Sequence, residues 1–353
     1  MPGKIIKSSQ FDELRKLQTD LLRDPANAKA GMLSGYVEND VGFAELQCLS
    51  AQPNEFVLLG DFLQSPVLLR ESKFVLSGYD ESIFQYSSLE GVLRAYAHCI
   101  NHLSTDLSDY VPVIFLSLGF YTSSTRLIEA NPNIGGIIHK SAGRDEVELA
   151  QYGDKERFDF LMNHSLPDSI LFVDGPIFTG ASTGWNFELS KKLPEKNCLP
   201  IFIVKNSTSD IINQKYRLGY NNDLHWAYQE LPEYSRTPYF RYVSEMQGGG
   251  ARRVKIFCYL KTAQNHSPCR LEMSENVFNI LRQQSISKYT ALELLEMTML
   301  HQFILNGLKR NNQVRIIEIA EMYARDALKS THIYQMAEEF GLTATMNESR
   351  GFN

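Results

Sequence analysis

Short apolar runs recur along this chain, and each is bounded by turn-forming residues. Runs of this length that are rich in Val, Ile, Leu and Phe predict buried β-strands. The predicted strands are residues 56–59, 73–76, 111–120, 170–174, 201–204, 254–261 and 270–273. The last two flank a polar segment, residues 264–268, that ends in Pro268, so we expect them to pair as a hairpin.

Other segments place apolar residues three or four positions apart, which is the period of an amphipathic helix. The predicted helices are residues 5–24, 89–103, 144–163, 185–193 and most of 275–342. The helix at 144–163 is the clearest, although Gly153 interrupts its apolar stripe. Residues 185–193 lie between the strands 170–174 and 201–204, so we expect them to form a crossover helix.

The order of these elements predicts an α/β protein. Three early strands, a helix and later strands that carry acids at their tips fit a ribonuclease-H-like core with a mixed sheet. The helical pattern at 5–24 adds an N-terminal helix, and the pattern after residue 305 adds a helical C-terminal extension.

Composition indicates a soluble globular protein. The chain has 353 residues, of which 43% are hydrophobic and 22% are charged, so it can bury a large core. Its net charge of -6 provides no overall basic field, and nucleic-acid binding would need a local basic groove or a partner. The local basic residues are Lys191, Lys192, Arg252, Arg253, Lys255, Lys309 and Arg310, and a solvated surface is the favoured explanation for them.

The five cysteines are scattered, and no C-x-x-C pair occurs among them. This spacing predicts neither a zinc site nor a disulfide framework, and it is typical of reduced thiols in the cytoplasm. The sequence shows no signal peptide and no run of about 18 apolar residues. We therefore expect a cytoplasmic protein with no membrane span.

Residues 216–251 combine many aromatic side chains with Arg217, Arg236 and Arg241. Such a mixture can stack on the bases of a nucleic-acid single strand. A satellite hydrophobic cluster beneath long loops explains the same pattern, and it is the favoured interpretation.

Two predicted strands deliver a charged residue to their ends. The strand 170–174 ends in Asp174, which Gly175 and Pro176 follow, and the strand 201–204 is followed by Lys205. An acid and a base at corresponding strand ends suit phosphodiester chemistry, in which carboxylates hold divalent ions and a lysine neutralises the phosphate. Mn²⁺ and Mg²⁺ prefer such oxygen ligands.

A site of this kind needs further carboxylates, one from an early strand and one from a helix. Asp61 follows the strand 56–59 and is the first candidate, but Asp80 follows another predicted strand and competes for the role. Glu146 or Glu148 is the candidate from the central helix. The two glutamates are about 200° apart around a helix, so they cannot both serve one metal ion.

Each candidate also has a structural explanation. Asp174 with Gly175 forms a common turn sequence, Glu146 and Glu148 favour the positive start of a helix, and Lys205 can reach solvent from a strand end. The hypothesis gains weight because all of these residues occur in the order that the site requires.

With these motifs, the chain resembles the NurA family of DNA-end-processing nucleases, which have a ribonuclease-H-like core. The matching segments are residues 144–150 (RDEVELA), 171–176 (LFVDGP), 203–207 (IVKNS), 257–261 (FCYLK), 268–272 (PCRLE) and 289–303. In the first of them, Glu146 follows Arg144 and Asp145 as in the family pattern, so Glu146 is preferred over Glu148.

The resemblance implies a nuclease that uses Mn²⁺ or Mg²⁺ and acts on single-stranded DNA and on the 5′ strand at duplex ends. It also implies a homodimer that works with a HerA-type hexameric ATPase in DNA repair or phage defence. The implied metal ligands are Asp61, Glu146 and Asp174, with Lys205, Arg270 and His301 toward the substrate. The implied parts are an N-terminal helical and dimerisation segment at 1–50, a nuclease domain at 51–305, and a helical extension and tail at 306–353.

The chain departs from the family in two places. The family's first acid is followed by glycine, whereas Phe62 follows Asp61 here. The family's late helix carries an Ala-His pair after Tyr-Pro, whereas Thr290 follows Tyr289 here and His301 is the candidate replacement. One alternative follows from these departures, a catalytically weakened adaptor that docks a motor ATPase. A further alternative is a different ribonuclease-H-like enzyme, such as an RNA nuclease or an Argonaute-like domain.

Overall fold

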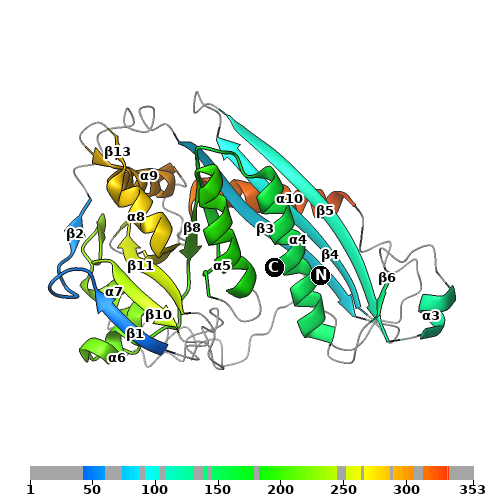
Figure 1. Cartoon of the computed structure of the whole chain (residues 1–353), viewed down its shortest axis with the longest axis horizontal. Coiled ribbons are helices and arrows are strands. Elements are labelled where there is room, and N and C mark those ends of the chain that lie inside the picture. Colours follow the sequence, from blue (N-terminus) through cyan, green and yellow to red (C-terminus); the bar gives the residue numbers. More distant parts are fainter. Residues whose placement is uncertain are drawn as a thin grey trace, which may run out of the picture.

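The structure is a computed structural model of the whole chain (Figure 1). It describes residues 43–59, 74–87, 92–103, 109–123, 125–130, 138–140, 145–178, 183–244, 252–263, 266–286, 289–305, 313–331 and 333. The predicted helix at 5–24, Asp61, and the basic pair Lys309 and Arg310 lie outside the described residues.

One mixed sheet of twelve strands organises the described part of the chain. Its strands are β1 (Phe43–Cys48), β2 (Val57–Leu58), β3 (Val75–Ser87), β4 (Val92–Leu103), β5 (Tyr110–Thr122), β6 (Ile138–Lys140), β7 (Ser169–Asp174), β8 (Cys198–Val204), β9 (Ser235–Arg236), β10 (Phe240–Ser244), β11 (Arg253–Lys261) and β12 (Cys269–Ser274). The helices are α3 (Thr125–Ala130), α4 (Asp145–His164), α5 (Thr183–Lys192), α6 (Ile211–Tyr216), α7 (Asp223–Glu230), α8 (Glu275–Gln283), α9 (Ala291–Leu305) and α10 (Arg315–Ser330), with a 3-10 turn η5 (Leu193–Lys196). A separate small hairpin joins β13 (Ser285–Ile286) to β14 (Tyr289–Thr290).

The central strands have the order of a ribonuclease-H-like core. The strands β3, β4 and β5 pair antiparallel in sequence, β7 joins the free edge of β3 in parallel, and β8 pairs with β7 in parallel. The predicted α/β class with a mixed sheet is therefore confirmed by the strand order itself.

The sheet continues beyond β8 through the predicted hairpin. The strands β11 and β12 pair antiparallel, and β12 also pairs with β8. The strand β10 follows β11, and β1 from the N-terminal part of the chain closes that edge.

The segment 89–103 was predicted as a helix, and this prediction is wrong. Residues 92–103 form β4, which pairs with β3 on one side and with β5 on the other. Nearly all of its residues are buried, because helices cover the sheet here as well. A strand buried on both faces shows no alternation of apolar and polar residues, so its pattern is ambiguous between strand and buried helix.

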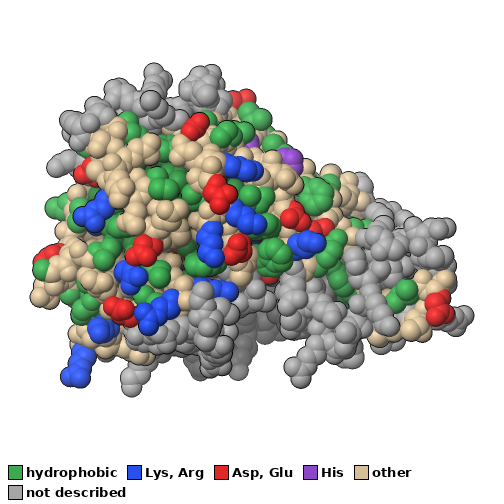
Figure 2. All heavy atoms as spheres, in the orientation of Figure 1, with side chains coloured by type: hydrophobic (Ala, Val, Ile, Leu, Met, Phe, Trp, Pro, Cys, Tyr) green, Lys and Arg blue, Asp and Glu red, His purple; other side chains and the backbone are tan. Residues whose placement is uncertain are grey.

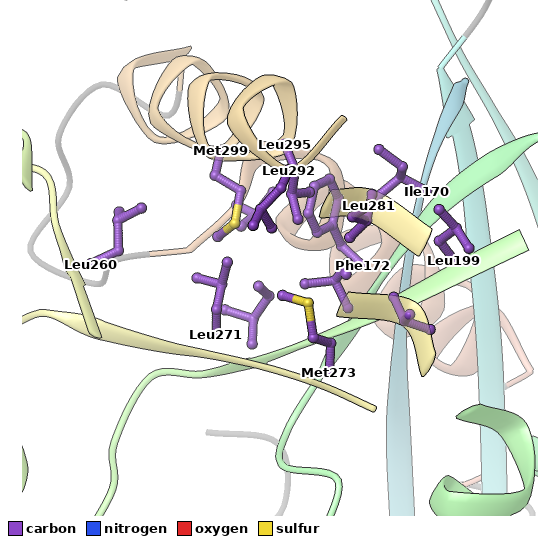
Figure 3. Close-up of a cluster of buried hydrophobic side chains, with 14 of the residues drawn as sticks. Ile170, Phe172, Leu199, Leu260, Leu271, Met273, Leu281, Leu292, Leu295 and Met299 are labelled. Atoms are coloured by element: carbon purple, nitrogen blue, oxygen red, sulfur yellow. The ribbon is translucent and has the colours of Figure 1, made fainter. Parts of the chain in front are cut away.

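Helices cover both faces of the sheet, so the core lies in two layers (Figure 1). On β7, Ile170 and Phe172 join the cluster with α8, α9 and α10, whereas Leu171 and Val173 join the cluster with α4 and α5. Figure 3 shows the first of these clusters, with Phe172 beneath the side chains of α9. This alternation decides which face each strand-end side chain reaches.

The aromatic segment at 216–251 forms the predicted satellite cluster. Trp226, Phe240 and Tyr242 are buried together against Phe257 and Tyr259 of β11. Burial removes these rings from contact with bases and confirms the favoured interpretation. The cysteines form no disulfide, and four of the five are buried. Within the described residues, no helix is long and apolar enough to cross a membrane.

Helix α10 packs unusually close to β3 at Gly78. A Cβ atom added there would lie 2.8 Å from the backbone carbonyl carbon of Ile316, which is closer than atoms of this kind approach in proteins. Only a glycine allows this approach, and the approach sets the height of α10 above the sheet.

Replacing Gly78 with alanine is expected to destabilise the protein by about 1–3 kcal/mol, because backbone has to move to admit the methyl group. Gly184 in α5 is the matched control, since a Cβ there meets nothing within 4 Å. Gly184→Ala is expected to be neutral or to stabilise by up to about 1 kcal/mol. Urea unfolding of both variants measures the difference, and equal stabilities would contradict the close packing.

Candidate functional site

A cavity lies at the point where β3 extends past the end of β7. Pairing between the two strands ends at Tyr79 and Val173, and β7 itself ends at Asp174. Beyond this point β3 continues with β4 alone, which opens a space at the carboxyl edge of the parallel strands. Ligands of α/β sheets bind at this edge. The cavity measures about 440 Å³, and it is lined by Tyr79, Asp80, Glu81, Ile83, Asp154, Arg157, Asp174, Gly175, Pro176, Lys205 and Glu321.

The register and the alternation of the strands bring three charged side chains to one face. Asp80 and Asp174 each follow directly after the paired residues Tyr79 and Val173, so they are neighbours across the sheet. Lys205 comes directly after β8. Its Nζ lies 3.1 Å from Oδ1 of Asp174, and neither side chain is more than 27% exposed.

Helix α10 adds a further carboxylate, that of Glu321, to the cavity. The helix packs mainly on β3 and β4, and its buried stripe includes Ile317, Ala324 and Leu328. Glu321 lies in the same stripe, four residues after Ile317. Oε2 of Glu321 accepts a hydrogen bond of 3.2 Å from Gln313, and Oε1 pairs with Arg325.

The sequence analysis missed Glu321. Its signal is an acid within the apolar stripe of an amphipathic helix, where a charged side chain has no structural reason to be. A search of each predicted helix for such acids would have found it.

The electrostatics of this face favour a bound cation. Burial, together with the nearby charge of Asp174, raises the pKa of Asp80 well above its usual value. Burial also raises the pKa of Asp174, which the charge of Lys205 opposes. Burial lowers the pKa of Lys205, but Asp174 and Asp80 outweigh it and raise that pKa overall. Lys205 thus serves two buried carboxyl groups, and the charge of Arg157, which also lines the cavity, lowers the pKa of Asp174 as well.

Glu81, which also lines the cavity, is an acid whose charge is already balanced by its neighbours. Glu81 accepts a hydrogen bond of 2.9 Å from the hydroxyl of Tyr79, and Nδ1 of His98 lies 3.3 Å from the same carboxylate. Burial raises the pKa of Glu81, but the hydrogen bond from His98 and the charge of Arg157 outweigh it and lower the pKa to about 2. Adjacent acids on β3 therefore differ: the pKa of Glu81 is lowered, whereas the pKa of Asp80 is raised although its Oδ1 accepts a hydrogen bond of 2.8 Å from the backbone N–H of Glu81.

The donor chemistry of the cavity fits a divalent metal ion. Asp80, Asp174 and Glu321 offer hard carboxylate oxygens, which Mg²⁺ and Mn²⁺ prefer. In the arrangement shown, no three His, Cys, Asp or Glu side chains of the described residues are grouped closely enough to hold an ion.

Comparisons with known proteins give low similarities. No protein-family model and no curated protein matches the sequence. Among solved structures, the NurA nuclease from Sulfolobus solfataricus is similar with a TM-score of 0.49 and 8% identity, over 95% of this chain and 98% of that one. Endonuclease V from Ciona intestinalis, in complex with DNA containing an inosine, is similar with a TM-score of 0.34 and 12% identity, over 73% of this chain and 87% of that one. A second NurA structure has a TM-score of 0.21 and 7% identity, over 86% of this chain and 64% of that one. Similarities this low support no conclusion about this chain, and its fold assignment rests on its own strand order.

Of the residues predicted for the site, the structure brings Asp174 and Lys205 together. Asp61 lies outside the described residues, whereas its competitor Asp80 lies beside Asp174 in the cavity. Glu146 and Glu148 belong to the first turn of α4, as predicted, and their roles remain predictions.

Arg270 and His301 lie elsewhere. Arg270 is fully buried in β12, where its guanidinium lies 2.7 Å from Glu272. His301 lies in α9, which packs on α8, and burial lowers its pKa. Neither side chain lines the cavity. The helix that does reach the cavity from the C-terminal part is α10, and it brings a glutamate there.

Proposed function

We propose that this protein is a metal-dependent nuclease that hydrolyses phosphodiester bonds in DNA. The observation that carries the proposal is the grouping of Asp80, Asp174 and Lys205 on one face of a ribonuclease-H-like sheet, in a cavity at the carboxyl edge of its strands. Buried carboxylates short of positive charge, beside a protonated lysine, suit a phosphate group with its metal ion.

The carboxylates and the lysine of the cavity would have different roles. Asp80, Asp174 and Glu321 would hold Mn²⁺ or Mg²⁺, and Glu146 is the further acid that the sequence proposes. The ion would polarise the phosphate and activate water when bound. Lys205 keeps its proton because the neighbouring acids raise its pKa, so it can neutralise a phosphate oxygen. Its contact with Asp174 places this charge at the cavity.

The finer proposal follows the resemblance to the NurA family. It comprises a cytoplasmic homodimer that acts on single-stranded DNA and duplex ends with a HerA-type hexameric ATPase, in DNA repair or phage defence. The net charge of -6 supports a partner of this kind, since the chain has no overall basic field to hold DNA. Figure 2 shows acidic and basic side chains interspersed over the face in view.

The test is cleavage of end-labelled single-stranded DNA, duplex DNA and RNA with Mn²⁺ or Mg²⁺, and with EDTA as the metal-free control. We expect metal-dependent cleavage of DNA that Asp80→Asn removes and Asp61→Asn leaves intact. Loss of cleavage in Asp61→Asn, with cleavage retained in Asp80→Asn, would show that Asp61 is the first acid of the site. Cleavage of RNA alone would favour the alternative ribonuclease-H-like enzyme.

A second candidate is the non-catalytic adaptor that docks a motor ATPase. It is favoured by the close pairing of Lys205 with Asp174 and by the absence, within the described residues, of three metal-binding side chains grouped together. It predicts tight binding to the ATPase and no Mn²⁺-dependent cleavage, with or without that partner. Cleavage that appears only with the partner present would support the nuclease.

A further inference from the structure

A network of buried charges lies behind the cavity on β11 and β12. Oε1 of Glu272 is 2.7 Å from Nζ of Lys255 and 2.7 Å from Nη2 of Arg270. All three side chains are at most 3% exposed. Figure 3 shows Leu271 and Met273 in the apolar cluster beneath α9, so Arg270 and Glu272 alternate to the opposite face of β12.

The network holds the turn that follows Asp174. The backbone N–H of Ile177 donates a hydrogen bond of 2.9 Å to Oε2 of Glu272. Nδ2 of Asn186 donates a bond of 3.0 Å to the carbonyl of Pro176 from the α5 side. Directly before these two residues, Gly175 has a φ of 95°, a conformation that glycine adopts without strain. The turn is thus fixed at successive residues just after the acid.

The same network holds the segment that follows Lys205. Nη1 of Arg270 donates a hydrogen bond of 2.7 Å to Oγ of Ser207, which is buried. Because Arg270 also pairs with Glu272, one connected set of buried groups anchors both segments that leave the sheet at the cavity.

We propose that Glu272 and Arg270 are positioning residues that set the distance between Asp174 and Lys205. Neither residue touches the cavity, and each acts through the backbone or side chain of a turn. A buried ion network contributes little net stability compared with apolar residues of the same volume, so stability does not explain it well. Fixing two turns against each other does explain it, because catalytic groups need placement within about 0.5 Å. The inference rests on the proposed nuclease function.

Two variants cut the network in different ways. Ser207→Ala removes the anchor on the Lys205 side, together with the hydrogen bond of 3.2 Å that the Ser207 hydroxyl accepts from the backbone N–H of Ser209. The triple variant K255M/R270M/E272M removes both anchors without leaving a buried charge unpaired, which Glu272→Gln alone would do. Glu296→Gln is the matched control, since Glu296 is equally buried and pairs with Arg236 at 2.7 Å, away from the cavity.

The readouts are kcat and KM for Mn²⁺-dependent DNA cleavage, and hydrogen exchange of the backbone amides of Ile177 and Ser207. We expect kcat to fall roughly tenfold in Ser207→Ala and about 10- to 100-fold in the triple variant, with KM little changed. Exchange should accelerate at Ser207 in the first variant and at both amides in the triple variant, but not in the control.

Folded variants with wild-type kcat or wild-type exchange at these amides would overturn the positioning role. Equal acceleration in Glu296→Gln would also overturn it, because the effect would then be general loss of stability. If the triple variant does not fold, Ser207→Ala decides alone. If the wild-type protein cleaves nothing, with or without the ATPase partner, the nuclease proposal fails, and the exchange measurement still decides whether the network fixes the two turns.

Discussion

Asp174→Asn is expected to abolish metal-dependent cleavage and to leave the fold intact. The substitution keeps the shape of the side chain but removes the charge that holds both a metal ion and Lys205, whose Nζ lies 3.1 Å away. Misplacing the metal ion and the lysine together should lower kcat on the order of 10²-fold or more.

The same variant should be as stable as the wild-type protein or slightly more stable. Burial raises the pKa of Asp174, which means that the folded state holds the charged form at a cost. Asparagine carries no charge and avoids that cost. Thermal unfolding without metal, in parallel with the cleavage assay, measures both effects.

Asp168→Asn is the matched control for Asp174→Asn. Asp168 is exposed next to the opposite end of β7, and its φ of 51° is one that asparagine also tolerates. It should change neither cleavage nor stability. Retained cleavage in Asp174→Asn would remove Asp174 from the chemistry, and a fall in stability would show that the carboxylate is part of the folding core.

Lys205→Met is expected to abolish cleavage and to destabilise the protein in a pH-dependent way. Methionine keeps the apolar length of the side chain and removes the cation that serves Asp174 and Asp80. The loss should be on the order of 1–3 kcal/mol at neutral pH, below the value for a fully buried pair, because both partners keep some solvent exposure.

The sign of the pH dependence follows from the two carboxyl groups. Without Lys205, the pKa values of Asp80 and Asp174 rise further above those of the unfolded chain. A folded state that holds protons more tightly is favoured at low pH and loses that advantage as pH rises through the folded pKa. Lys205→Met should therefore lose most stability at neutral pH and least below the ordinary aspartate pKa of 3.8.

Lys191→Met provides the matched control for Lys205→Met. Nζ of Lys191 also lies 3.1 Å from a carboxylate, that of Glu188, but these side chains are 55% and 45% exposed. Exposed pairs of this kind contribute about 0.2–1 kcal/mol at most. Equal pH profiles for the two methionine variants would show that Lys205 is an ordinary surface lysine.

The local pattern of the sequence was enough to predict the two strand ends at which Asp174 and Lys205 lie. The run at 170–174 is apolar because helices cover both faces of β7, and the charged Asp174 marks the point where that cover ends. The same holds for Lys205 after β8. Such features depend on neighbours along the chain, so they could be predicted together with the helix α4 and the hairpin of β11 and β12.

The sequence left open which first acid belongs to the site. Asp61 and Asp80 both follow apolar runs, and nothing local separates them. The parallel register between β3 and β7 places Asp80 beside Asp174, whereas Asp61 lies outside the described residues. Register depends on pairing between segments far apart in the chain, and the apolar run of one strand does not contain it.

Only the tertiary structure decided the remaining features. It made residues 92–103 a strand, because β3 and β5 pair along both of its edges. It brought Glu321 to the cavity, because Gly78 lets α10 approach the sheet closely. It also placed Arg270 behind the cavity, paired with Glu272. The sequence by itself determined most of the elements and the charged residues at two strand ends, since these follow from local periodicity. The tertiary structure decided which acids meet, since that follows from strand register and helix packing.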